Sequence, residues 1–196
     1  MEIVLASGSP RRKRLLGKIV PRFSVVPPSV DERLKKGEPF PKACLRLAEE
    51  KARAVAEKRP GCTVIGADTI AYRGKKIFRK TEDKQIARKI LLELSGKIHT
   101  VVTGVAVIFP TGNATAYAAR ASVRMKKLDG RLLENYLKSS EWRGRAGCYD
   151  ISGKGRLLVE KVNGERETVV GLPLARLRLI LKGKKDKKRQ RLQLPL

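Results

Sequence analysis

The first chemistry-bearing feature of this 196-residue sequence is a Ser/Gly turn that ends in two arginines, Ser7-Gly8-Ser9-Pro10-Arg11-Arg12. A helix that starts here would turn its free N–H groups and its positive end toward an anion. Arginine forks bind phosphate oxygens in a bidentate manner, so the turn suits a di- or triphosphate better than a single carboxylate. A surface turn with a capping serine and two solvated arginines is the alternative interpretation.

A second feature combines carboxylates and lysines whose roles are complementary. These residues are Glu32, Lys51, Asp68 and Lys80. Transfer or hydrolysis of a polyphosphate needs cations at its oxygens, carboxylates that hold Mg²⁺ and a base that orients water. The alternative is one buried ion pair without a chemical role, because buried charges are usually paired.

The arginine turn lies where a strand passes into a helix. Residues 3–6 are a short apolar run, and residues 11–19 have the composition of a helix. Ser9 is the expected N-cap, and Pro10 stands where a first helical residue tolerates a missing N–H. We therefore expect a strand, a tight loop and a helix in that order.

Two further elements must position the lysines and carboxylates. Residues 41–58 repeat apolar side chains every three or four positions, which is typical of an amphipathic helix, and Lys51 lies within that stripe. Residues 63–71 are rich in β-branched side chains and predict a strand with Asp68 in its middle. Lys51 and Asp68 each break an apolar pattern, and residues that do so are often functional.

The rest of the chain predicts a mixture of helices and strands. It contains a helix that begins at residues 81–83 and ends at Gly96, strands over 100–109 and 114–125 that form a hairpin, a helix over 128–137 capped by Asp129, a strand over 157–162, and a final helix over 173–181. Helices and strands alternate in the first half, whereas the second half contains the hairpin. The predicted fold class is therefore α/β, with a mixed β-sheet flanked by helices.

The charge of the chain is unusual, because 45 Lys and Arg against 19 Asp and Glu give a formal net charge of +26. Such a charge attracts polyanions, and it also occurs in proteins adapted to high temperature or high salt. Residues 182–196 form a basic tail that we expect to be disordered, but most of the excess charge lies in the body. Aromatic residues are only 5% of the chain, which disfavours a platform for stacking single-stranded bases.

Several function classes lose support from what the sequence lacks. His99 is the single histidine, so we expect a structural, hydrogen-bonded residue rather than a metal ligand or a triad base. The three cysteines have no metal-binding spacing, and we expect them to be buried or half-buried thiols. No P-loop or dinucleotide-binding glycine pattern occurs. No apolar run approaches the ~18 residues of a membrane helix, and no secretory signal begins the chain, so we expect a cytoplasmic protein.

Eight segments, taken in order, resemble one known family. They are Leu5 to Arg12, Val30-Asp31-Glu32, Leu47 to Ala52, Gly66-Ala67-Asp68-Thr69, Lys80, Ser95 to Val105, Gly144-Arg145-Ala146-Gly147, and Val169 to Leu174. In these segments the chain resembles the Maf family of nucleoside triphosphate pyrophosphatases, also called septum-formation inhibitor proteins. The resemblance covers residues 1–181, and the basic tail of residues 182–196 lies outside it.

The resemblance implies a fold related to inosine triphosphatases and a house-cleaning activity. The reaction would be hydrolysis of a nucleoside triphosphate to the monophosphate and pyrophosphate with a divalent metal cation, Mg²⁺ or Mn²⁺. A homodimer is also implied. Carried over position by position, the residues that hold the triphosphate would be Ser7, Arg11, Arg12, Lys51 and Lys80. Glu32 and Asp68 would coordinate the metal, and Asp68 would also be the catalytic base toward the attacking water.

The resemblance also bears on the base that is accepted. The branch of the family that acts on dTTP and UTP carries Arg-Arg after the proline and Asp-Thr in the strand, as this chain does at Arg11-Arg12 and Asp68-Thr69. The expected specificity residues are Arg11, Thr69 and Ser152. Ser152 stands where that branch has a base-reading Gln, and a hydroxyl is too short to copy the paired donor and acceptor of an amide. We expect dTTP, UTP or modified relatives as substrates.

A second function, from a different class, stays open at this point. The chain could be a basic nucleic-acid-binding or cell-division regulatory protein that retains a nucleotide site. Counterion release makes nucleic-acid binding fall steeply with salt, whereas catalysis at a compact site depends mainly on its metal ion. Nucleic acid is thus a possible but not a favoured partner, and no membrane partner is expected.

Overall fold

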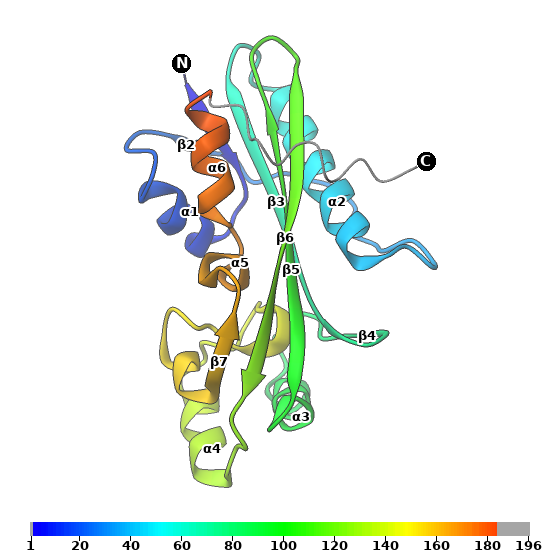
Figure 1. The fold of residues 1–196 in the computed structure, drawn as a ribbon, viewed down its shortest axis with the longest axis vertical. Helices are drawn as coiled ribbons and strands as arrows, with labels where there is room; N and C mark the ends of the chain where they lie inside the picture. The colour runs from blue at the N-terminus through cyan, green and yellow to red at the C-terminus, as the bar shows by residue number, and fades with distance from the viewer. Residues whose placement is uncertain (1, 184–196) are drawn as a thin grey trace.

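A mixed β-sheet with helices on both faces forms the body of the protein (Figure 1). The computed structural model describes residues 2–183. The strands are β1 (Ile3–Ala6), β2 (Ser24–Val25), β3 (Thr63–Arg73), β4 (Lys76–Ile77), β5 (Ile98–Ile108), β6 (Ala114–Met125) and β7 (Val159–Asn163). They are ordered β2-β1-β3-β5-β6-β7, and β4 pairs with β3. Strand β1 runs parallel to β2 and β3, and the other pairs are antiparallel.

Six α-helices accompany these strands in the described part of the chain. They are α1 (Pro10–Gly17), α2 (Phe40–Ala56), α3 (Lys84–Leu94), α4 (Gly130–Lys138), α5 (Arg166–Val170) and α6 (Leu174–Leu181). Short 3-10 turns occur at Ala146–Cys148 and Lys154–Leu158. Among residues 2–183, no helix is long and apolar enough to cross a membrane.

The predicted elements are confirmed, with shifted ends. Ser9 caps α1 by accepting a hydrogen bond from the N–H of Arg12, but this helix ends at Gly17. Asp83 caps α3, so the helix begins at Lys84 and not at residues 81–83. The strand predicted from residue 157 begins at Val159, because the preceding residues form a 3-10 turn. Strands β2 and β4 and helix α5 were not predicted, and most of the basic tail, residues 184–196, lies outside the described residues.

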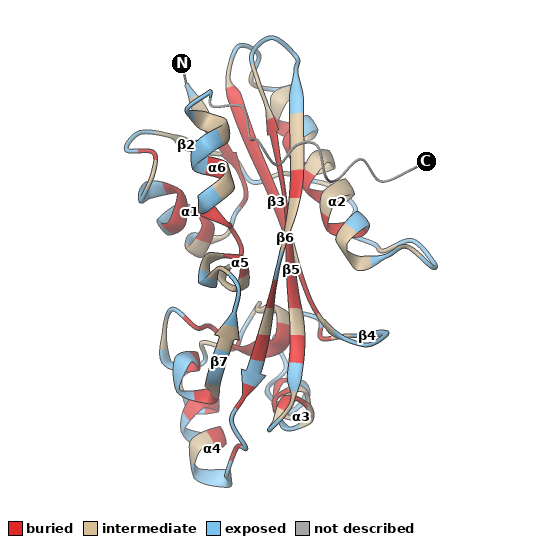
Figure 2. Ribbon diagram, viewed as in Figure 1, coloured by how far each residue is buried: buried red, intermediate tan, exposed pale blue. Residues whose placement is uncertain are grey.

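The two faces of the sheet follow from the alternation of apolar side chains along its central strands. Val4 and Val64 pack against α2, whereas their neighbours Leu5 and Ile65 pack against α1 and α6 on the opposite face. This is the period of two that a strand buried on both faces requires. Figure 1 shows α2 on one side of the sheet with α1, α5 and α6 on the other, and Figure 2 shows the central strands as the most buried segments.

Two strand glycines allow α2 to lie unusually close to the sheet. A Cβ at Gly66 would overlap the carbonyl oxygen of Ala48, and a Cβ at Gly104 would overlap the carbonyl oxygen of Cys44. Glycine is the residue that permits such a close approach of two backbones. The close approach brings the α2 face that carries Lys51 onto β3.

Strand β3 has a free stretch of edge that marks the site. Strand β1 pairs with β3 only as far as Gly66, and β4 pairs with it only at Tyr72 and Arg73. Between these pairings, on the side away from β5, lie Asp68 and Thr69. The carboxyl end of a parallel strand next to such a gap is a common place for ligands in α/β sheets.

Candidate functional site

A buried lysine joins two carboxylates at this edge. Lys51 Nζ lies 2.7 Å from Asp68 Oδ1 and 2.6 Å from Glu32 Oε1. Lys51 and Asp68 are 3% and 4% exposed, whereas Glu32 lies on a loop that is open to solvent. The buried ion pair considered for Lys51 and Asp68 is therefore present, but it does not end there, because Glu32 extends it toward solvent.

The charges around Glu32 set its protonation. Burial alone would raise the pKa of Glu32, but the hydrogen bond and charge of Lys51, with Lys80 nearby, lower it below its ordinary value. Lys80 Nζ lies 3.9 Å from Glu32 Oε2, and burial lowers the pKa of Lys80. The carboxylate of Glu32 is therefore ionised at neutral pH and available to a cation.

Arg12 connects a second group of polar residues at the site. Its Nε donates to the carbonyl of Gly171 at 2.9 Å, and its Nη groups donate to Ser7 Oγ at 3.3 Å and to Thr69 Oγ1 at 3.0 Å. Thr69 in turn bonds to Thr103 across the sheet at 2.9 Å. Burial lowers the pKa of Arg12, and the charges of Asp68 and Glu32 oppose that effect. The guanidinium is thus held firmly and stays close to both carboxylates.

A cavity of about 410 Å³ lies between these groups and the start of α1. The site residues that line it are Ser7, Arg11, Arg12, Glu32, Lys51, Thr69 and Lys80, together with Gly144, Arg145 and Ala146 of the glycine-rich loop. A second cavity of about 240 Å³ adjoins it and is lined by Asp68, Glu32, Thr69 and Lys80. Glu32 lines both cavities, whereas Asp68 lines only the second, which is largely apolar. The charged side chains around the first cavity are mainly cationic, which suits a polyanionic ligand.

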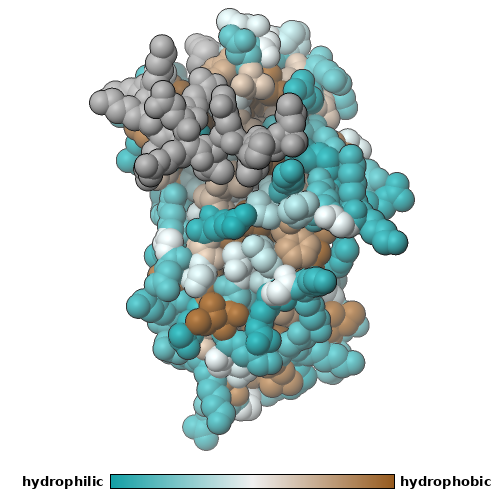
Figure 3. Space-filling view, turned by 45° about the vertical axis from the view of Figure 1, so that its right-hand side comes forward, coloured by the Kyte–Doolittle hydropathy of each residue, from teal (hydrophilic) through white to brown (hydrophobic). Residues whose placement is uncertain are grey.

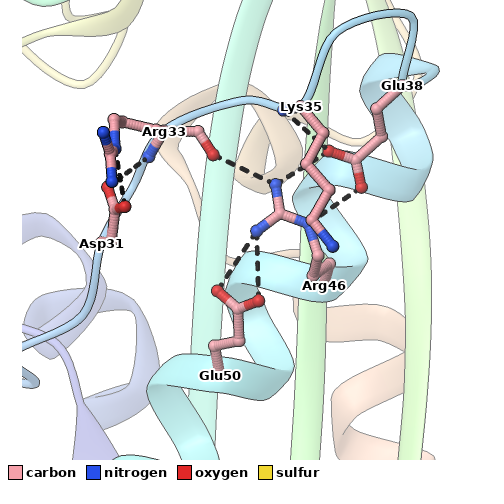
Figure 4. A network of polar contacts seen from close by, with 6 residues as sticks. All are labelled: Asp31, Arg33, Lys35, Glu38, Arg46 and Glu50. Atoms are coloured by element: carbon pink, nitrogen blue, oxygen red, sulfur yellow. Dashed lines mark hydrogen bonds and ion pairs between the residues drawn. The ribbon is translucent and has the colours of Figure 1, made fainter.

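The loop that carries Glu32 is fastened to α2 by one arginine (Figure 4). Residues 26–39 contain no helix or strand. Arg46 donates to both carboxylate oxygens of Glu38 at 2.9 and 2.8 Å, to Glu50, and to the carbonyl of Arg33 at 3.2 Å. Since Arg33 follows Glu32 directly, this network fixes the backbone next to the carboxylate.

A further charged group lies near the glycine-rich loop. Asp150 Oδ2 lies 3.9 Å from the Nε of Arg11 and 3.5 Å from the Nε of Arg145. Asp150 Oδ1 accepts from the N–H and hydroxyl of Ser152 at 2.9 and 2.5 Å. Ser152 does not line the cavity, so its connection to the site runs through Asp150.

The structure brings together the predicted phosphate and metal residues around two adjoining cavities, and Ser152 lines neither of them. Of the expected specificity residues, Arg11 and Thr69 line the first cavity, and Thr69 hydrogen-bonds Arg12. His99 hydrogen-bonds the hydroxyl of Tyr149 at 2.7 Å inside the core, which agrees with a structural role. Cys44 and Cys148 are buried and Cys62 is half-buried, all three as free thiols.

Sequence reasoning missed several residues that shape the site. They are Arg46, Thr103, Arg145, Asp150 and Gly171. Thr103, Arg145 and Gly171 lie within the family-like segments, so membership of a motif was the available signal. For Asp150 the only signal was a carboxylate in a glycine-rich loop. Arg46 gave no signal of a role at the site, because an i,i+4 pair such as Arg46 and Glu50 is ordinary on a helix and its contacts with the preceding loop appear only in the fold.

The carboxylates of Asp68 and Glu32 are suited to binding Mg²⁺. Asp68 and Glu32 lie close together, because an oxygen of each contacts the Lys51 ammonium. Within residues 2–183, no group of three or more His, Cys, Asp or Glu side chains could hold a metal ion. A pair of carboxylates does suit Mg²⁺, which is usually bound by one or two carboxylates together with substrate phosphates and water. The donor set therefore fits a metal that arrives with a phosphorylated substrate.

Comparison with known proteins decides the family. The family described as "Maf-like protein" matches residues 2–184. This chain belongs to the Maf family. A relative from Novosphingobium aromaticivorans named dTTP/UTP pyrophosphatase is 41% identical over 182 residues, which is 92% of this chain and 90% of the relative. One of the same name from Clostridioides difficile is 39% identical, over 93% of this chain and 94% of the relative.

Solved structures of Ham1 proteins are similar in fold to this chain. The Ham1 protein of Staphylococcus aureus superposes with a TM-score of 0.54 at 15% identity, covering 93% of this chain and 99% of that chain. A HAM1 protein from Coxiella burnetii gives 0.53 at 15% identity, with the same coverage. At such low identity these likenesses concern the fold alone, and the mixed sheet flanked by helices agrees with the expected architecture.

Proposed function

We propose that this Maf-family protein hydrolyses dTTP, UTP and modified relatives to the nucleoside monophosphate and pyrophosphate. The observation that carries the proposal is the Lys51 ammonium shared by Asp68 and Glu32 at the boundary of a cation-lined cavity. Relatives at about 40% identity over most of the chain carry the name dTTP/UTP pyrophosphatase, which supports the same reaction.

Each side chain then has a task in the hydrolysis of the α–β phosphoanhydride bond. Lys80, Arg12 and the start of α1 bind phosphate oxygens, since Lys80 and Arg12 are among the cations that line the cavity and the positive end of α1 opens onto it. Lys51 holds Asp68 in place, and Asp68 orients the attacking water and accepts its proton. Glu32 and Asp68 would hold the divalent metal, which when bound neutralises charge on the phosphates.

The proposal includes a homodimer in the cytoplasm, as expected from the sequence. Three large apolar side chains at one end of the molecule support an interface there: Ile86, Leu92 and Ile98 are 44–49% exposed. Figure 3 shows hydrophobic patches on the lower half of one face among mostly hydrophilic side chains. Sedimentation of the purified protein at several concentrations tests the dimer, and a single monomeric species would refute it.

The direct test of the function is a panel of nucleoside triphosphates. Pyrophosphate release would be measured for canonical and modified nucleotides with Mg²⁺ or Mn²⁺, and without metal as a control. We expect release from dTTP and UTP that requires the metal. Silence across the panel would refute the proposal and favour the nucleic-acid-binding alternative.

A further inference from the structure

Asp150 is a buried carboxylate that the proposed chemistry does not use. It is 7% exposed, and its side chain is oriented by Ser152, whose N–H and hydroxyl both donate to Oδ1. Its backbone is also fixed, because its N–H donates to the hydroxyl of Tyr136 and a Cβ at Gly155 would overlap its main chain. Oδ2 is therefore directed at Arg11 and Arg145 by a rigid support.

The two arginines that face Asp150 line the cavity. Both Nε atoms are buried without a hydrogen-bond partner in the described part of the chain, and both lie within 4 Å of Asp150 Oδ2. Burial and the neighbouring charge of Arg145 lower the pKa of Arg11 to about 10, so the guanidinium still carries its charge at neutral pH. Asp150 thus holds two charged donors at the cavity wall.

The charge of Asp150 determines which ligand group the guanidiniums of Arg11 and Arg145 can bind well. Burial raises the pKa of Asp150, but the hydrogen bonds from Ser152 and the two guanidiniums lower it below its ordinary value, so it is ionised. The carboxylate cancels one of the two positive charges and repels a phosphate oxygen placed against it, so this cluster binds a multiply charged phosphate less well than two free guanidiniums would. A neutral carbonyl oxygen meets no such repulsion and still accepts from a guanidinium.

The arrangement of the cavity agrees with this division. Glu32, Asp68 and Lys51 form the part that fits the metal and the phosphates. The guanidiniums of Arg11 and Arg145 form a separate cluster around Asp150. A nucleotide whose phosphates lie at the first cluster must place its base away from it.

We propose that Asp150, oriented by Ser152, is a positioning residue that directs Arg11 and Arg145 at a carbonyl oxygen of the base. The enzyme then prefers uracil and thymine, which carry an oxo group at C4, over cytosine, which carries an amino group there. This inference rests on the proposed function and names the device that selects its substrates. Ser152 contributes through Asp150, since its hydroxyl is used there and not on the base.

The test compares UTP with CTP, two triphosphates that differ at this edge of the base. Values of kcat and KM for both would be measured for the wild type, Asp150→Asn, Ser152→Ala and the surface control Glu160→Gln. Glu160 is exposed and lies 4.0 Å from Arg124, so its substitution removes a carboxylate charge outside the cavity. Thermal melting of each variant would report its folding.

We expect the preference for UTP over CTP to fall about tenfold in Asp150→Asn, through a higher KM for UTP, because a buried donor loses its fixed position. Ser152→Ala should lower the preference less, and Glu160→Gln should keep it.

An equal loss on both substrates, or an unchanged ratio, would overturn the inference while the pyrophosphatase activity stood. If Asp150→Asn failed to fold, the UTP-to-CTP preference of Ser152→Ala would test the inference, and an unchanged preference would overturn it. A wild type inactive on both substrates would remove the proposed function, and this inference with it.

Discussion

At the scale of single residues, the site depends on buried charges that compensate one another. Lys51 stands among the apolar residues of α2, and two carboxylate oxygens lie within 2.7 Å of its ammonium. Removing one partner of such a cluster leaves an uncompensated charge, which costs more than the pair contributes. The same charges that could be a mere structural pair therefore also fix Asp68 beside the cavity.

His99 makes stability depend on pH. Burial lowers the pKa of His99 to about 4 from 6.5, so between these values the unfolded chain binds a proton that the folded chain does not. The free energy of unfolding should therefore rise as the pH increases through this window. It should fall by up to about 3 kcal/mol as the pH decreases through it. Denaturant unfolding of the wild type and His99→Gln at pH 4.5 and 7 would measure the difference. Equal pH dependence in both proteins would refute this role.

The sequence revealed those residues whose type conflicts with their surroundings. Lys51 and Asp68 interrupt apolar patterns, so their importance was predictable before their contact was known. The bond from Arg12 to Thr69 joins residues 57 positions apart, and only the packing of α1 against the sheet creates it. Asp150 was visible only as an unexpected carboxylate, because its arginine partners come from two different segments.

At the scale of elements, the approach of α2 to β3 positions the central ion pair. We expect Gly66→Ala to destabilise the protein by about 2 kcal/mol or more, because its Cβ would push against the backbone of Ala48. Turnover should fall too, since Lys51 would move away from Asp68. Gly17→Ala is the matched control, because a Cβ there meets nothing within 4 Å. Melting and turnover of both variants would be compared, and similar behaviour would contradict the close-approach argument.

The Arg46 network makes a second prediction at this scale. Arg46→Gln should loosen the loop next to Glu32 and raise the metal concentration needed for half-maximal turnover several-fold, because the bidentate pair with Glu38 is lost. Arg33→Gln is the control, since the Arg33 side chain bonds Asp31 alone among residues 2–183 and its carbonyl remains. Metal titrations of the two variants measure the effect. Identical curves would show that the network does not position Glu32.

Long, periodic elements were predictable, as were the short strands β1 and β7, but β2, β4 and α5 were not. Helix α2 and the hairpin of β5 and β6 have enough residues to show their periods. Strands β2 and β4 have two residues each, and α5 has five, so no period could appear. These short elements form because neighbouring segments supply their partners: β4, for example, pairs with the end of β3 beyond the free edge.

At the scale of the whole molecule, the charge of +26 exceeds what one cavity needs. We predict that a chain shortened to residues 1–183 keeps the turnover of the full chain, because the family match extends over residues 2–184 and the described site lies before the tail. Turnover and retention of duplex DNA would be measured for both chains over a range of salt concentrations. DNA retention should fall steeply with salt, while turnover changes little. Loss of turnover on shortening would assign the tail a part in the reaction.

The measurement that tests the central claim most directly is pyrophosphate release from UTP and dTTP by Asp68→Asn, with Mg²⁺ and beside the wild type. Asparagine keeps the shape of the side chain but cannot accept the proton of water. We expect a loss of turnover of at least about a hundredfold, with the folded structure retained in a melting experiment. A near-normal rate in Asp68→Asn would contradict the proposed role of this carboxylate and of the cluster built around it.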